Sequence, residues 1–132
     1  MLESAEINDA EMVRVIADFL EQGLVGNIVA MFKADTGYYR LIGRVLQDER
    51  FAVRLGVAVL FEELIEQRPA EVTLALPALT PLLHDGTPAY VRGEAVNLLG
   101  MIGSKKALAL IEPLAHDKDP QVAEIVKDFL AR

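Results

Sequence analysis

Two His–Asp pairs stand out among the residues that could do chemistry, namely His84-Asp85 and His116-Asp117. Imidazole and carboxylate groups are good ligands for iron, zinc or manganese. Two pairs supply a thin ligand set, however, and each pair ends a predicted helix, where a histidine interacts favourably with the helix dipole. We therefore expect a structural role for both pairs, with no metal site and no bound cofactor.

Other catalytic arrangements find little support. Glu62 and Glu63 are adjacent, and adjacent residues on a helix do not face each other as an acid–base pair would. The chain has no cysteine, which excludes disulfides and thiolate chemistry. It also lacks a Ser/His/Asp order and a glycine-rich phosphate loop. We expect a protein that is not an enzyme, with no catalytic residues.

The charge balance bears on possible partners. The formal net charge is −7, and the only notable basic pair is Lys105-Lys106. An acidic domain repels a phosphate backbone and an anionic membrane surface. The stretch 51–65 is too short and too charged to span a bilayer, and the first residues lack a secretory pattern. The sequence therefore predicts a cytoplasmic protein that binds neither nucleic acid nor membrane.

Apolar residues recur with helical periodicity along nearly the whole chain, which predicts an all-α fold. Asn8 or Asp9 can cap a first helix, and Gly23 can end it in a left-handed conformation. The periodicity and the residues that cap or break helices divide the chain into eight predicted helices. The connections between these helices are short, so neighbouring helices should be antiparallel. Their approximate ranges are 9–22, 24–32, 38–46, 49–67, 69–84, 89–102, 104–116 and 120–130.

An internal repeat organises these helices. The segment 81–85 (PLLHD) matches 113–117 (PLAHD), and both blocks precede a short turn and a helix that starts near a valine. Asp48 lies in an earlier copy, 37 residues before Asp85, and Asp117 follows Asp85 by 32 residues. A single copy would carry no weight, but three copies at similar spacing predict a stack of helix pairs that share one apolar core.

These residues resemble the HEAT repeat family, especially its short variant named for phycobilin lyase subunits. In that family an aspartate closes the first helix of a pair, and Val-Arg opens the second. The resemblance implies one domain, residues 1–132, folded as an α-α superhelix of about eight helices. It covers residues 36–132, whereas residues 1–35 match poorly and would form an atypical N-terminal cap or a degenerate repeat.

The resemblance also separates frame residues from binding residues. Asp48 keeps the family spacing to Arg54, Asp85 lies one residue further from Arg92 than the family pattern, and Ala123 replaces the arginine that would follow Asp117. The aspartates can accept hydrogen bonds at the turns, and the arginines can pair with aspartates of neighbouring turns. We expect a structural repeat frame of Asp48, Arg54, Asp85, Arg92 and Asp117.

In solenoids of this kind the second helix of each pair lines the concave side. Transferring the register between the copies predicts a strip that is apolar in its middle and acidic at its edges. The strip comprises Val59, Glu63, Tyr90, Glu94, Asn97, Met101, Ile125 and Asp128. Such a surface suits an amphipathic or basic segment of another protein, and the leading prediction is a protein-interaction scaffold. The alternative for the strip is ordinary surface, with Val59 and Ile125 covered by adjacent helices.

Two other functions follow from the resemblance alone. The chain could be a subunit of a phycobilin-lyase-like enzyme that attaches a chromophore to another protein. It could also resemble HEAT-like nucleic-acid-binding or metal-binding proteins, such as DNA glycosylases or deoxyhypusine hydroxylase. The strip contains no lysine or arginine, which counts against nucleic acid.

Overall fold

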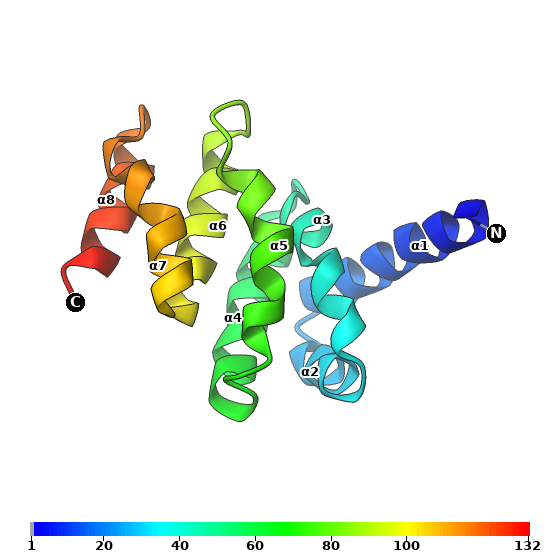
Figure 1. Cartoon of the computed structure of the whole chain (residues 1–132). Coiled ribbons are helices and arrows are strands. Elements are labelled where there is room, and N and C mark those ends of the chain that lie inside the picture. Colours follow the sequence, from blue (N-terminus) through cyan, green and yellow to red (C-terminus); the bar gives the residue numbers. More distant parts are fainter. Residues whose placement is uncertain (1) are drawn as a thin grey trace.

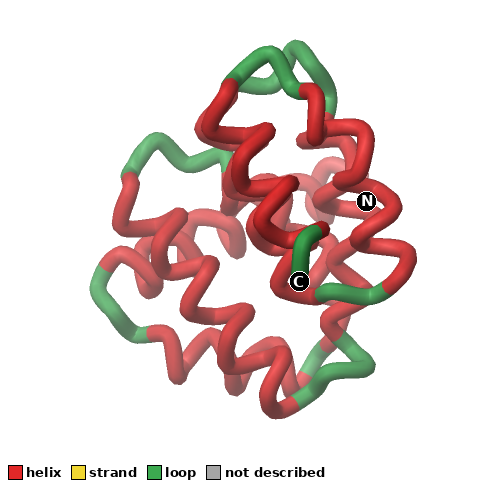
Figure 2. Tube along the Cα trace, turned by 90° about the vertical axis from the view of Figure 1, so that its left-hand side faces the viewer, coloured by secondary structure: helices red, strands yellow, loops and turns green. Residues whose placement is uncertain are grey.

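The computed structural model describes the backbone of residues 2–132 and the side chains of residues 8–132, and every regular element in this part of the chain is helical (Figures 1 and 2). The elements are α1 (Leu2–Glu21), α2 (Val25–Ala34), η1 (Thr36–Leu41), α3 (Ile42–Leu46), α4 (Phe51–Gln67), η2 (Val72–Ala75), α5 (Leu76–Leu79), η3 (Thr80–Leu83), α6 (Ala89–Ile102), α7 (Lys105–Ile111), η4 (Glu112–His116) and α8 (Pro120–Leu130), where η marks a 3-10 segment. The all-α prediction is confirmed.

The helices pack as a stack of antiparallel pairs. Helices α1, α4, α6 and α8 follow one another in a row, each in contact with the next. The segments α3, α5 with η3, and α7 with η4 pack behind this row against α4, α6 and α8. The two ends of the chain lie at opposite ends of the stack (Figure 1).

The predicted helices 69–84 and 104–116, the first helices of the last two pairs, are broken at prolines. Pro77, Pro81 and Pro113 each lie at the start of a new short segment. Proline lacks the N–H that an α-helix needs and clashes with the preceding turn, so 3-10 turns replace a continuous α-helix. The second helices α6 and α8 contain no internal proline and run over the predicted ranges.

The N-terminal region departs from the predicted helix limits. Helix α1 begins at Leu2 and not at the predicted cap, Asn8 or Asp9. The intervening residues include Leu, Ala and Glu, which favour helix, so the helix continues through that position. The end of α1 agrees with the prediction, because Gly23 has a φ of 80°, in the left-handed region.

Helix α2 crosses beside α4 and η1 and is firmly held there. Ile28 and Phe32 are fully buried, and the Phe32 ring meets Tyr39 edge-on at 4.9 Å between centroids. Tyr39 in turn meets Phe61 of α4 at 6.2 Å. Edge-to-face pairs of this kind contribute roughly 0.5–1.5 kcal/mol beyond the area they bury. This aromatic chain fixes α2 alongside α4.

A buried ion pair joins the last two helix pairs. Arg92 of α6 is 1% exposed, and it donates from Nε and Nη2 to the two carboxylate oxygens of Asp117 at 2.8 and 2.7 Å. Its Nη1 donates to the carbonyl oxygen of Thr87. The hydrogen bond from Arg92 lowers the pKa of the Asp117 carboxyl, against the opposing effect of burial. The turn before α8 is therefore locked onto the start of α6.

The other frame residues make different contacts. Arg54 donates to the carbonyl oxygens of Asp48 and Glu49 in its own turn, both at 2.9 Å, and does not reach Asp85. Asp85 lies at the surface and meets Lys118 at 3.2 Å. The turn that carries Asp85 is one residue longer than its counterparts, which gives room for the carboxylate to point outward.

Asp48 is held by a neighbour that the repeat pattern does not single out. Arg50 donates to both carboxylate oxygens of Asp48, at 2.9 and 3.0 Å. The same guanidinium reaches Asp18 and Glu21 of α1, each at 3.0 Å. This cluster links α1 to the start of α4 and so fixes the position of the α1 end.

Replacing Asp117 by Ala should destabilise the fold by about 3–5 kcal/mol, because Arg92 would remain buried without its counter-charge. Urea unfolding followed by far-UV circular dichroism measures the change. The matched control is Asp85→Ala, which removes an exposed ion pair and should cost less than about 1 kcal/mol. Equal losses in the two variants would contradict the role assigned to the Arg92–Asp117 pair.

Candidate functional site

Helix α4 exposes apolar side chains on the face opposite its buried one. Phe51 is 64% exposed and Leu55 52% exposed, and both lie in the first half of the helix. Ala52 is also exposed and Val59 is half-buried beside them. A helix that is apolar on all sides is normally covered on all sides, so this uncovered face needs an explanation.

The exposed apolar surface continues onto α6 through an arginine. The Arg54 guanidinium lies 4.6 Å from the centroid of the Tyr90 ring and 5.7 Å from that of Phe51. Tyr90 itself is 47% exposed. We call Phe51, Ala52, Leu55, Val59 and Tyr90 the apolar patch.

A groove runs beside the apolar patch, between α4 and the α1–α2 connection, and Ala52, Leu55 and Val59 of the patch line it. The groove has two hollows. The upper hollow lies beside the first half of α4 and has a volume of about 350 Å³, and the lower hollow lies beside the second half and has a volume of about 450 Å³. Val25 and Val59 line both hollows, so the two lie next to each other along α4. The upper hollow is lined by Leu20, Glu21, Gly23, Val25, Ala52, Leu55, Gly56 and Val59, and the lower one by Val25, Gly26, Val29, Ala30, Lys33, Val59, Glu63 and Gln67. We call the two together the α4 groove.

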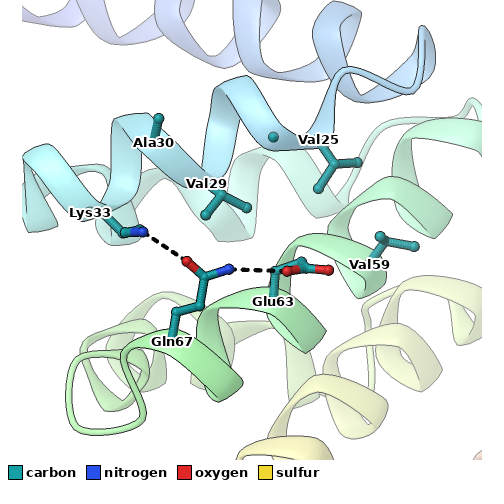
Figure 3. A pocket seen from close by; sticks show the side chains of 8 residues that line it. Val25, Val29, Ala30, Lys33, Val59, Glu63 and Gln67 are labelled. Carbon is teal, nitrogen blue, oxygen red and sulfur yellow. Dashed lines mark hydrogen bonds between the residues drawn. The ribbon is translucent and has the colours of Figure 1, made fainter.

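The groove exists because α1 and α2 are placed accurately against α4. Gly56 has no side chain, and a Cβ there would lie 2.8 Å from the Cβ of Leu20. The end of α1 therefore contacts the α4 backbone directly. Beyond this contact the chain turns at Gly23 and returns as α2, which forms the far wall of the lower hollow (Figure 3).

Polar side chains close the lower hollow (Figure 3). Lys33 donates from Nζ to Oε1 of Gln67 at 2.8 Å, and Gln67 donates from Nε2 to Oε2 of Glu63 at 3.1 Å. Glu62 and Glu66 are exposed on the same end of α4. The last turn of α4 contains no basic residue. This end of the groove is therefore acidic.

Glu94 of α6 lies half-buried near Arg54. Burial raises the pKa of the Glu94 carboxyl, and the nearby Arg54 charge partly offsets this effect. The site thus combines an aromatic ring, a guanidinium and a partly desolvated carboxylate over α4 and α6.

The structure distributes the eight strip residues unevenly. Val59 and Glu63 line the groove, and Tyr90 and Glu94 lie near Arg54. Asn97 and Met101 are half-buried further along α6, where Asn97 donates to the Met101 sulfur at 3.5 Å. On α8, Ile125 is half-buried against Gly93, whereas Asp128 is exposed.

The most exposed apolar residues were not in the predicted strip. Phe51 and Leu55 are on α4, as are the strip residues Val59 and Glu63, but they were not included in the strip. The strip also contained no residue of α2, which forms one wall of the groove. The sequence carried a signal for the first two, because Arg54 is the one polar residue in the segment 51–60, so apolar side chains also occupy faces of the helix other than the buried one. The α2 wall had no such signal, since it depends on how α2 turns back onto α4.

The two His–Asp pairs lie apart from this face. Nδ1 of His84 accepts a hydrogen bond from the Gly86 N–H at 2.9 Å, and His116 is exposed at the end of η4. Within residues 8–132, no three or more His, Asp or Glu side chains gather as metal ligands would. No helix in the described part of the chain has the length and apolar character needed to cross a membrane.

Changing Glu94 to Gln should raise the melting temperature at pH 7 and leave it nearly unchanged at about pH 4. A carboxyl with a raised pKa in the folded state binds protons more tightly there, so its ionised form costs stability as the pH rises above the ordinary value of about 4.3. Thermal unfolding at the two pH values measures the effect. Glu124→Gln, at an exposed position inside α8, serves as the control and should change neither melting temperature. A lower melting temperature for Glu94→Gln at pH 7 would refute this reading.

Comparison with known proteins finds a similarity in the C-terminal part of the chain. Residues 76–131, which span the segment from α5 to α8, match the family model described as HEAT repeats. The match does not extend to the short phycobilin-lyase variant of the family. No curated protein and no solved structure matches the chain. The repeat spacing, the paired helices and this match agree that residues 76–131 are similar to HEAT repeats.

Proposed function

We propose that the protein is a non-catalytic protein-interaction module whose partner lies across the face formed by α4 and α6. The observation that carries this proposal is the exposure of Phe51 and Leu55, at 64% and 52%, on a helix that is otherwise packed in the middle of the stack. Binding of another protein would cover this surface.

The composition of the face fits a protein partner. Interfaces are enriched in aromatic residues and arginine at their centre, and the centre here holds Phe51, Arg54 and Tyr90. Burial of apolar area contributes about 25 cal/mol per Å², so these side chains would supply most of the affinity. The acidic residues around them would act mainly on orientation and association rate.

The strip predicted from the sequence takes a revised form in this proposal. Val59, Glu63, Tyr90 and Glu94 belong to the binding surface, together with Phe51 and Leu55. Asn97 and Met101 continue it along α6. Ile125 and Asp128 form its outer edge on α8.

Replacing Leu55 by Asp should abolish partner capture without unfolding the protein, because the side chain is half exposed and the charge would lie in the middle of the interface. The measurement is affinity capture of binding proteins by the immobilised chain, quantified by mass spectrometry. Leu74→Asp is the matched control, since Leu74 is 49% exposed and lies on η2, away from the face.

Circular dichroism and thermal unfolding verify that both variants fold. The wild-type chain and the Leu74 variant should retain the same captured protein, while the Leu55 variant loses at least about nine-tenths of it, as for a hot-spot residue. Equal capture by the Leu55 and Leu74 variants would rule out this face.

A further inference from the structure

We infer that the α4 groove binds an amphipathic helix of the partner, with two apolar side chains about seven residues apart and basic residues next to one of them. This inference rests on the proposed function, because it names the chemistry of the partner for the same face. Three features of the groove carry it: the spacing of the hollows, the apolar lining and the charge at one end.

The spacing of the two hollows favours a helix. Ala52, Leu55, Gly56 and Val59 line the upper hollow from α4, and Val59, Glu63 and Gln67 line the lower one. The centres of these two sets are about seven residues apart, which is about 11 Å at 1.5 Å per residue. Positions i and i+7 on one face of a bound helix have the same separation.

An extended segment fits this spacing poorly. Side chains on one face of a strand recur about every 6.6 Å, so they lie about 6.6 or 13 Å apart along the chain and not 11 Å. In a bound helix, the residues between the two anchors would pass over Val25 and Val59, which line both hollows. The i, i+3, i+4 and i+7 pattern of an amphipathic helix supplies apolar side chains at these places.

The lower end of the groove selects for positive charge. Glu62, Glu63 and Glu66 lie in the last two turns of α4, and no described lysine, arginine or histidine nitrogen lies within 4 Å of their carboxylates. Lys33 also lines the lower hollow, where it donates to the neutral Gln67 amide, so its one positive charge offsets only part of the charge of the three glutamates. Arg68 donates to the carbonyl oxygen of Gln67 and pairs with Glu71. Acidic residues at a helix C-terminus also oppose the helix dipole, so a cation placed there relieves two unfavourable interactions.

The upper end differs because its acidic residues already have a cation. Glu21 lines the upper hollow, and the Arg50 guanidinium meets it at 3.0 Å together with Asp18 and Asp48. Three carboxylates share this one guanidinium, whereas Glu62, Glu63 and Glu66 have no ion pair among the described residues, so the basic residues of the partner belong next to the anchor that fills the lower hollow.

The test uses labelled synthetic helices of about 15 residues, long enough to follow α4. The first peptide carries leucine at i, i+3, i+4 and i+7 and two lysines one turn beyond the last leucine. The second has glutamates in place of the lysines. The third keeps the lysines and moves the last leucine to i+5, on another face of the helix. Fluorescence anisotropy with the full chain gives the three dissociation constants.

The lysine peptide should bind about threefold to tenfold more tightly than the glutamate peptide in low salt, as two or three exposed ion pairs would give, and this ratio should fall toward one in 1 M salt. The peptide with the shifted leucine should bind about tenfold more weakly or worse, because one hollow would stay empty. Only one direction of the bound peptide places its lysines next to Glu63, and the leucine spacing is the same read from either end, so the peptide can adopt that direction.

A charge reversal on the protein separates the local effect from the overall acidity. Glu63→Lys with Glu66→Lys should reverse the preference between the lysine and glutamate peptides. Glu11→Lys with Glu112→Lys changes the net charge equally at exposed sites elsewhere and should leave the preference for the lysine peptide in place.

The outcomes distinguish this inference from the proposed function. If the glutamate peptide binds as well as the lysine peptide, or if no peptide binds, while capture of a partner still depends on Leu55, the helix inference is overturned and the proposed function stands. If sedimentation shows that the chain self-associates through Leu55 without any peptide, the occupant is a second copy, and the inference is also overturned. If capture does not depend on Leu55, the proposed function itself fails.

Discussion

A pair of helices with one apolar face each cannot bury those faces alone, and the whole stack follows from this constraint. In the α1, α4, α6 and α8 row, the inner helices α4 and α6 have a row neighbour on both sides and further helices behind them, so mainly their outward faces remain in water. For most of the row that face is polar or partly covered. Helix α4 is the exception, because its outward face carries Phe51 and Leu55. The same stacking that makes the core therefore leaves the binding surface at a defined place, with rigid neighbours.

Much of this arrangement could be predicted from the sequence. The fold class, the antiparallel pairs and the ends of α6 and α8 follow from periodicity, capping residues and the repeated Asp and Val positions. The 3-10 breaks at Pro77, Pro81 and Pro113 also have a local cause. The start of α1 could not be predicted in this way, because no residue before Asn8 stops a helix and no local residue marks the first turn.

The site was predictable only in part, for a physical reason. Which residues share a face of α4 or α6 depends on helix geometry, so Val59, Glu63, Tyr90 and Glu94 could be grouped in advance. The groove depends on the return of α2 along α4, which the packing of Phe32 on Tyr39 and of Tyr39 on Phe61 decides. Contacts between residues so far apart in the sequence have no signature in either segment alone. The contacts of Arg54 could not be predicted either. The turn at Asp85 has one extra residue, so Asp85 does not pair with Arg54 as expected, and the Arg54 guanidinium lies against the Tyr90 ring.

The missing Arg54–Asp85 pair also has a mechanical consequence. Arg50 ties α1 to the start of α4, and the Arg92–Asp117 pair ties α6 to the turn before α8. Between these two clamped blocks, no described side-chain hydrogen bond or ion pair connects residues 8–68 with residues 85–132. Apolar contacts are non-directional and tolerate small sliding movements better than a bidentate ion pair does. The junction between α4 and α6 is therefore held by apolar packing and by the contact of Arg54 with Tyr90, without the bidentate ion pair that holds the junction after it.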